Sequence, residues 1–295
     1  MRISRIGVGA WAWGDRLYWG YGRSYNDYDL RGAFEAALGA GVNWFDTAEV
    51  YGFGRSEQIL GQFLSSADRP VVIASKFMPF PWRLRRGSLL GALRGTLRRL
   101  GLERVDLYQI HWPFPPMPVE TWMDAFAEAV QAGLVRAVGV SNYSVEQMRR
   151  AHAALTKRGV PLASNQVEYS LLERAPERSG LLDACRELGV TLIAYSPLAQ
   201  GLLTGKYSKA SPPSGMRGRR MRKRLTKIEP VVASLREIGE ARDKTPGQVA
   251  LNWLICKGAV AIPGAKTAQQ AEQNAGALGW RLTDDEVVAL DSVAP

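Results

Sequence analysis

Short apolar and β-branched runs recur along the chain, and helix-like segments separate them. We predict strands near Ile6–Ala10, Val42–Asp46, Val71–Lys76, Val105–His111, Val135–Ser141, Leu162–Gln166, Thr191–Tyr195 and Ala259–Ile262. We predict helices near Leu30–Ala40, Ser56–Leu64, Leu89–Leu100, Glu120–Gln131, Val145–Lys157, Gly180–Glu187, Pro230–Ala241, Ala268–Leu278 and Asp284–Val293.

These elements alternate at a spacing of about 30 residues, which is typical of parallel βα units. Eight such units favour an α/β fold, a closed (β/α)8 TIM barrel, with residues 1–295 as a single domain. Two segments interrupt the alternation, residues 112–118 and residues 204–227, and their Pro, Gly and charge content predicts loops. Because both follow predicted strands on the carboxyl side, we expect them to act as lids.

Composition and the first residues narrow the class of protein. No apolar run reaches about 18 residues, and the start, MRISRIGVGAW, lacks the apolar core of a secretory signal. We therefore expect a cytoplasmic protein with no membrane partner. Cys185 and Cys256 lie among apolar neighbours, which is typical of reduced core cysteines. Since the chain has only 2 histidines, we expect no metal site.

The net charge of +10 comes from one short segment. Between residues 201 and 228, nine basic residues meet no acid: Lys206, Lys209, Arg217, Arg219, Arg220, Arg222, Lys223, Arg224 and Lys227. Without them, 29 of the 38 basic residues remain against 28 acids. A local basic patch on an otherwise balanced chain indicates a local anion.

One apparent dinucleotide fingerprint is set aside. GVGAWA at residues 7–12 fits a relaxed glycine pattern, but the aromatic, Gly-rich stretch that follows does not begin a helix. Without the strand, turn and helix context, the pattern does not indicate a Rossmann site.

Four ionisable side chains lie at or just beyond the ends of three successive predicted strands: Asp46, Tyr51, Lys76 and His111. Each alone is more often structural, but in a barrel these strand ends share one face. The set suits carbonyl reduction, in which the oxygen needs a proton as hydride reaches the carbon. We expect Tyr51 to donate that proton, Lys76 to lower its pKa, Asp46 to hold Lys76, and a neutral His111 to orient the oxygen.

The later strand ends suit a nicotinamide dinucleotide. Ser141, Asn142 and Gln166 match a carboxamide, and Tyr195 offers a face for ring stacking. A Gly-containing loop after the seventh strand, with Ser196 and Lys206, offers amides and charge to a pyrophosphate. After the eighth strand, Gly264, Lys266, Gln270, Gln273 and Asn274 suit phosphate and adenosine, although an ordinary loop with a polar helix face fits that segment equally well.

In FDTAEVYGFGRSEQILG, SKF, QIHWP, VGVSN, NQVEYS, AYSPLAQGLLTGKY and IPGAKTAQQAEQN, the chain from about residue 6 resembles the aldo-keto reductase family. WAWGDRLYWGYG, FPWRL and GALGWRLTDDE resemble its plant and cyanobacterial pyridoxal reductase-like branch. The resemblance implies NADP(H) as cofactor and a catalytic tetrad at Asp46, Tyr51, Lys76 and His111. It places cofactor contacts at Trp11, Asp46, Ser141, Asn142, Gln166, Tyr195, Ser196, Pro197, Leu198, Gln200, Gly201, Lys206, Gly264, Lys266, Gln270, Gln273 and Asn274.

The sequence departs from the family at the adenosine end. Gln270 stands where many members carry arginine, and Gln273 stands where many carry glutamate. These departures leave two alternatives: the adenosine clamp is weaker, or Lys266 and the basic segment take over the 2′-phosphate. The absence of an acid near Lys266 favours NADPH over NADH, because NAD-selective sites usually present a carboxylate to the ribose.

The leading hypothesis is an NADPH-dependent reductase of small-molecule aldehydes or ketones, with pyridoxal or an aromatic aldehyde as substrate. The segments that carry Trp11, Trp19, Tyr21, Trp82 and Trp112 favour planar or apolar carbonyl compounds, and about half of these rings are expected to be packing alone. An alternative is an NADP(H)-binding regulatory or redox-sensing subunit with slow turnover. A nucleic-acid contact by RGRRMRKR is disfavoured, because that run has no interleaved aromatics. The oligomeric state stays open.

Overall fold

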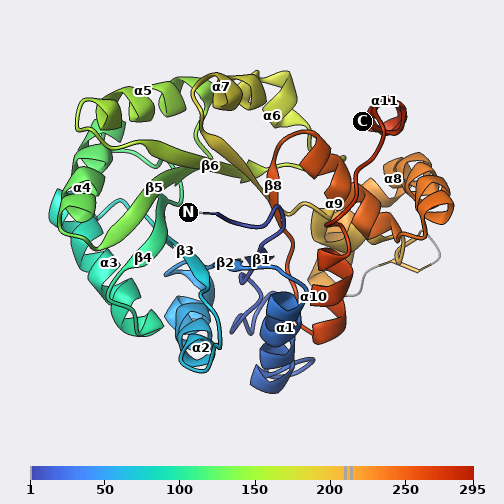
Figure 1. The fold of residues 1–295 in the computed structure, drawn as a ribbon, viewed down its shortest axis with the longest axis horizontal. Helices are drawn as coiled ribbons and strands as arrows, with labels where there is room; N and C mark the ends of the chain where they lie inside the picture. Colours follow the sequence, from blue (N-terminus) through green and yellow to red (C-terminus); the bar gives the residue numbers. More distant parts are fainter. Residues whose placement is uncertain (1, 209–210, 213–214) are drawn as a thin grey trace.

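Eight parallel strands stand side by side in one sheet, in the order in which they occur along the chain (Figure 1). The computed structural model describes residues 2–208, 211–212 and 215–295, and only the backbone at residues 215–224, 226 and 227. The strands are β1 Val8–Gly9, β2 Trp44–Asp46, β3 Val72–Phe77, β4 Val105–Ile110, β5 Val135–Ser141, β6 Leu162–Glu168, β7 Thr191–Tyr195 and β8 Val260–Ile262. All eight overlap the strands predicted from the sequence.

The sheet closes on itself where the chain before and within β1 meets β8. Gly7 N donates to Ala261 O at 2.8 Å, Gly9 N to Pro263 O at 3.0 Å, and Ala261 N to Arg5 O at 3.0 Å. Ile6 and Gly9 form parallel bridges with Ala261 and Gly264. The predicted (β/α)8 barrel is therefore confirmed.

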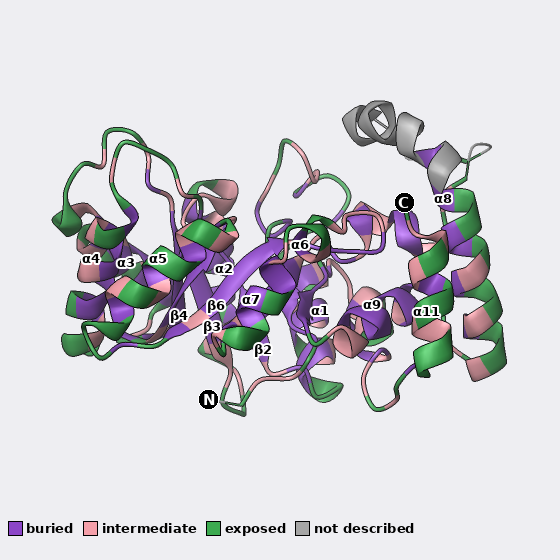
Figure 2. Ribbon diagram, turned by 90° about the horizontal axis from the view of Figure 1, so that it is seen from above, coloured by how far each residue is buried: buried purple, intermediate pink, exposed green. Residues whose placement is uncertain are grey.

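Helices surround the barrel and turn their buried faces toward it (Figures 1 and 2). Several begin with a side chain that satisfies the free amides of the first turn, as Asn26, Ser144, Thr245 and Thr283 do in capping boxes. The helices are α1 Asp27–Gly39, α2 Arg55–Leu64, α3 Arg86–Leu100, α4 Val119–Gln131, α5 Val145–Thr156, α6 Ala175–Arg178, α7 Leu181–Glu187, α8 Gly215–Arg242, α9 Pro246–Cys256, α10 Ala268–Ala275 and α11 Asp284–Val293, with 3-10 turns η1 Tyr51–Gly54 and η2 Ala199–Thr204.

The barrel interior is apolar at its floor and polar at its mouth. A separate cluster of alternate strand residues fills the floor: Trp44, Ala74, Leu107, Ile193, Val260 and Ile262. Gly7 lies against this floor, where an added Cβ would come within 2.3 Å of the Trp44 ring. The inward positions nearer the carboxyl ends of the strands carry Asp46, Lys76 and Gln109, all buried. The fold thus places its polar groups at one end of the barrel.

The predicted loop at residues 204–227 is wrong over its second half. The chain is helical from Gly215, and α8 passes through Pro230 without ending. The expected lid and anion-binding role of the basic run falls on Lys209 and on side chains at 217–224 and 227, which lie outside the described residues. Residues 112–118 form a loop as predicted. The sequence also failed to indicate α6 and α9.

Three further features concern the class of protein. In the parts of the chain that the structure describes, no helix combines the length and the apolar character needed to cross a bilayer. Cys185 and Cys256 are free thiols, the first of them buried. Over the same residues, no group of three or more His, Cys, Asp or Glu side chains is arranged to hold a metal ion.

Candidate active site

A buried ion pair lies at the centre of the barrel mouth. Asp46 ends β2 and Lys76 lies near the end of the neighbouring strand β3, and the two residues are 1% and 0% exposed. The ammonium of Lys76 donates to Asp46 Oδ1, and to Thr47 O at 3.0 Å. Because a buried charge is tolerated only when it is paired and hydrogen-bonded, this arrangement fixes the lysine in place.

Tyr51 and His111 complete the predicted group of four. Tyr51 opens η1, five residues after Asp46, and its hydroxyl lies 3.5 Å from Lys76 Nζ. The Tyr51 ring meets the His111 ring edge-on, at 5.6 Å between centroids and 81° between planes. The structure therefore brings all four side chains to one point, as the strand ends predicted.

The pKa values of Lys76 and Tyr51 reflect the balance between burial and charge. Desolvation lowers the pKa of Lys76, but Asp46 and Tyr51 outweigh it, and the net pKa is raised. Burial raises the pKa of Tyr51 above its usual value, although Lys76 acts in the lowering direction. Lys76 therefore acts in the direction that the sequence predicted, but burial is the larger effect, and Tyr51 keeps its proton at neutral pH.

His111 is neutral in this environment. It follows β4, is 9% exposed, and its burial, with a smaller effect of Lys76, lowers its pKa to about 3. Its Nδ1 atom is buried and has no hydrogen-bond partner among the described residues. A neutral imidazole beside the Tyr51 ring is suited to donate a hydrogen bond to an oxygen without competing for the positive charge of Lys76.

Gln109 belongs to this site and was missed by the sequence analysis. Its Nε2 donates to Asp46 Oδ2 at 3.2 Å, and Gln166 Nε2 donates to the same oxygen at 2.9 Å. Both amides therefore orient the carboxylate that holds Lys76. The pattern that points to Gln109 is the alternation of β4, since Leu107, Gln109 and His111 share the inward side of that strand.

The residues predicted to hold a carboxamide form one connected group. Asn142, with a left-handed φ of 61°, donates through Nδ2 to His111 O and to Ser141 Oγ, each at 3.0 Å. Ser141 Oγ donates to Gln166 O at 2.8 Å, and Tyr195 OH donates to Asn142 Oδ1 at 3.0 Å. The amides and the Tyr195 ring thus lie next to the tetrad.

The chain after β7 makes a series of tight turns, and the residues predicted to contact the phosphates lie in these turns. Its left-handed residues are Ser196, Ala199, Gln200, Gly201 and Gly205. An added Cβ at Gly201 would come within 3.1 Å of Lys206 Cε, so only glycine fits there easily. Pro197 and Leu198 lie within the same bend, and Gln200 Oε1 accepts from Tyr18 OH at 2.7 Å. This run of turns presents backbone groups in a concave arrangement suited to an anion.

The last group of predicted contacts lies between β8 and α10. Gln270 Oε1 accepts from Lys266 N at 2.9 Å, and Asn274 Nδ2 donates to Gly264 O at 3.3 Å. Gly264 is exposed, and an added Cβ there would meet only Gly9 O at 3.7 Å. Gln273 is exposed on α10. These residues lie on α10 and on the loop that leads into it from β8.

The aromatic residues of the segments expected near the barrel mouth differ widely in exposure. Trp11, Trp82 and Trp112 are 38%, 73% and 37% exposed, whereas Tyr21 is 5% exposed. Trp82 stacks on Phe80 at 4.6 Å, and Trp112 stacks on Phe114 at 5.8 Å. The exposed rings belong to the loops after β1, β3 and β4.

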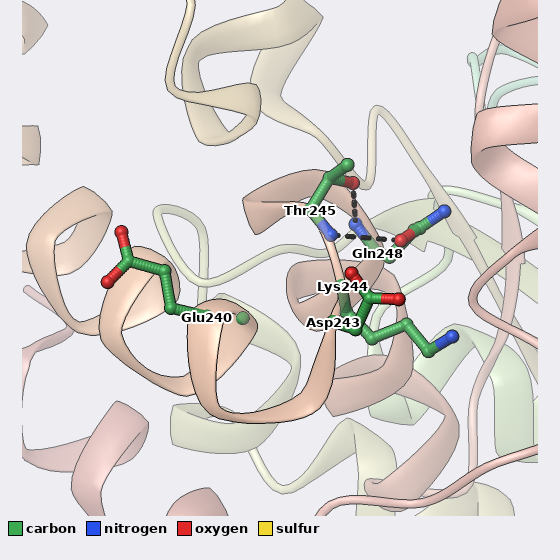
Figure 3. Close-up of a pocket in the computed structure, with 6 residues that line it drawn as sticks. Glu240, Asp243, Lys244, Thr245 and Gln248 are labelled. Carbon is green, nitrogen blue, oxygen red and sulfur yellow. Dashed lines mark hydrogen bonds between the residues drawn. The ribbon is translucent and has the colours of Figure 1, made fainter.

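Two hollows in the part of the chain that the structure describes can be compared with the position of the tetrad. One, of about 610 Å³, lies where α8 meets α9 (Figure 3) and is lined by Gly239, Glu240, Asp243, Lys244, Thr245 and Gln248. In it Thr245 and Gln248 satisfy each other in the capping box of α9, and no tetrad residue lines it. The other, of about 370 Å³, is lined partly by Trp112, Asn142 and Tyr195 and so adjoins the tetrad. The four side chains of the predicted tetrad therefore lie beside the smaller of these two hollows.

Known proteins are similar to this chain in sequence and in fold. The model of the aldo/keto reductase family matches residues 5–295. The chloroplastic pyridoxal reductase of Arabidopsis thaliana is 45% identical over 307 residues, covering 100% of this chain and 84% of that protein. An aldo-keto reductase of Klebsiella pneumoniae solved in complex with NADPH is 29% identical, with a TM-score of 0.80 over 99% of this chain and 92% of the other. The glycerol dehydrogenase of Gluconobacter oxydans is also 29% identical, with a TM-score of 0.87 over the same shares.

Proposed function

We propose, from the premise that this chain belongs to the aldo/keto reductase family, that it reduces aldehydes or ketones to alcohols in one barrel domain. It is an oxidoreductase whose cofactor is NADP(H), as in the relative from Klebsiella pneumoniae that was solved with NADPH. The observation that carries the proposal is the contact of the half-buried Tyr51 hydroxyl with the buried Lys76 ammonium at 3.5 Å.

The residues present fit the cofactor. Asn142, Ser141 and Gln166 supply amide and hydroxyl groups beside the tetrad, and Tyr195 adds a ring. The left-handed turns from Ser196 to Gly205 supply a concave backbone for phosphates. The exposed backbone at Gly264 and the charge of the half-buried Lys266 suit the adenosine end. When bound, the cofactor supplies the hydride that reduces the carbonyl carbon.

Tyr51 delivers the proton. Burial keeps its phenol protonated at neutral pH, and its hydroxyl proton passes to the carbonyl oxygen as that oxygen gains charge. Lys76 stays cationic because Asp46 raises its pKa, and it stabilises the phenolate that Tyr51 leaves behind. Neutral His111 donates a hydrogen bond to the same oxygen and orients it.

The substrate is an aromatic or otherwise planar aldehyde, and pyridoxal is the first candidate. The stacked pairs Phe80 with Trp82 and Trp112 with Phe114 favour flat molecules at the mouth. The 45% identity to the chloroplastic pyridoxal reductase supports pyridoxal in particular.

The test is a screen of NADPH oxidation with pyridoxal, a nitrobenzaldehyde, methylglyoxal and a ketosteroid. Tyr51→Phe should lower kcat by about 10²- to 10⁴-fold, because it removes the general acid and keeps the ring. Steady turnover with a flat aldehyde supports a reductase. A single burst without turnover on every substrate would contradict it and favour a cofactor-binding sensor. Turnover that Tyr51→Phe leaves intact would remove Tyr51 from its assigned role.

A further inference from the structure

Two aromatic rings from the start of the chain enclose the ammonium of Lys266. Lys266 Nζ lies 4.5 Å from the centroid of the Tyr25 ring and 5.6 Å from that of the Trp19 ring. Both distances are within the range of cation–π attraction. The rings belong to the segment between β1 and α1, whereas Lys266 follows β8, so the contact joins the two ends of the barrel sequence.

The segment that carries the rings is held by its own bonds. Asp15 Oδ1 accepts from Tyr18 N at 2.8 Å and from Trp19 N at 3.2 Å. Tyr25 OH donates to Ala12 O at 2.6 Å, and the Trp19 ring meets the Trp11 ring edge-on at 5.3 Å. The rings therefore have a defined position that does not depend on Lys266.

A lysine held in this way differs from a lysine on an open surface. A free lysine side chain has a long flexible stem and loses rotamer freedom when it binds a phosphate. The ammonium of Lys266 is partly ordered before any ligand arrives, because two rings attract it from a fixed direction. Less freedom then remains to be lost on binding, which strengthens the contact with the phosphate.

We propose that Trp19 and Tyr25 determine cofactor specificity by holding Lys266 for the 2′-phosphate that distinguishes NADPH from NADH. The inference rests on the proposed function, in which Lys266 meets that phosphate. Gln270, at the position where many family members carry arginine, uses its side-chain oxygen on Lys266 N at 2.9 Å. It therefore stabilises the same short segment from the other side.

The test measures dissociation constants for NADPH and for NADH by calorimetry on the full chain, without turnover. Trp19→Leu removes one ring and should weaken NADPH about fivefold while changing NADH less than about twofold. Trp19→Phe keeps a smaller ring and should give a smaller loss, and it replaces Trp19→Leu if that variant does not fold. Leu17→Ala, at an 84% exposed position of the same segment, is the matched control and should change neither constant.

Lys266→Met separates the two proposals. It should weaken NADPH more than about tenfold, as expected for loss of a charge-assisted contact, with NADH little changed. If Lys266→Met is selective but the Trp19 variants weaken both cofactors equally, or neither, the role of the rings is refuted and the phosphate role of Lys266 stands. If Lys266→Met leaves NADPH binding unchanged, the proposed phosphate contact fails, and the role of the rings fails with it.

Discussion

Removing one partner of the buried Asp46 and Lys76 pair should cost far more stability than removing both. Both residues are almost fully buried, and Lys76 Nζ also donates to Thr47 O at 3.0 Å. Asp46→Asn or Lys76→Met alone leaves an uncompensated charge in the barrel, which costs about 3–5 kcal/mol. The double variant Asp46→Asn/Lys76→Met has no stranded charge, and the amide introduced in place of the Asp46 carboxylate still offers an oxygen to Gln109 and Gln166.

The assay is urea unfolding followed by tryptophan fluorescence at neutral pH, with NADPH oxidation measured on the same samples. We expect the double variant to be more stable than either single variant by about 2 kcal/mol or more, while all three lose turnover. That result would show that the two charges depend on each other for stability and that both are needed for turnover. Additive losses, with the double variant the least stable, would refute the account of the pair as mutually dependent.

Three further outcomes follow from the structure. Because burial lowers the pKa of His111 to about 3, its contribution to stability is full above the unfolded value of about 6.5 and is lost as pH falls. Urea unfolding should therefore show the wild type losing about 2 kcal/mol more than His111→Asn between pH 7.5 and pH 5, and equal losses would contradict the assignment. Glu49→Gln keeps an acceptor but breaks the charged contact with Arg83 at 2.5 Å; urea unfolding at low salt should show a loss of about 2 kcal/mol, and no loss would mean that the pair is solvated. Asp291→Asn removes the 2.6 Å ion pair with Lys257, so calorimetry should show a Tm lower by about 2–4 °C, less at high salt; a salt-independent loss would point to packing instead.

Much of the site could be predicted because parallel strands end at the same face. To predict that Asp46, Lys76 and His111 lie together, only the positions of the strand ends are needed. The β-branched runs indicate these positions well. The hydrogen bonds that two glutamine side chains donate to Asp46 could not be predicted from the strand ends alone. Gln109 and Gln166 reach the carboxylate only because the closed barrel brings β4 and β6 around to β2, and no local pattern contains that curvature.

The sign of the pKa shift of Tyr51 is a second property that the sequence alone could not predict. Sequence reasoning identified Lys76 as a lowering influence, and the structure agrees on that sign. The larger effect is the desolvation of the phenol, which depends on how many atoms surround it. Opposing effects of similar size can be weighed only when the packing is known.

The helices α8 and α9 show where periodicity gives little information. α9 is buried at seven of its positions and so lacks a polar face, although Thr245 and Pro246 mark its beginning. In α8 the run of arginines was predicted as a loop and Pro230 as the start of a helix, yet the helix already includes Leu225 and Ile228, which are 3% and 2% exposed. Both segments are helical because of their packing against the rest of the protein, which the local sequence pattern does not contain.

The seam between β8 and the start of the chain has a consequence for how the ring of strands opens. β1 has only two residues, and the junction depends on three backbone hydrogen bonds, at Gly7, Gly9 and Ala261. Deuterium should therefore enter these amides earlier than those of β4 and β5, which share a longer ladder. Local breathing would begin at this joint, so the segment that carries Trp19 and Tyr25 would move away from Lys266 before β4 separates from β5.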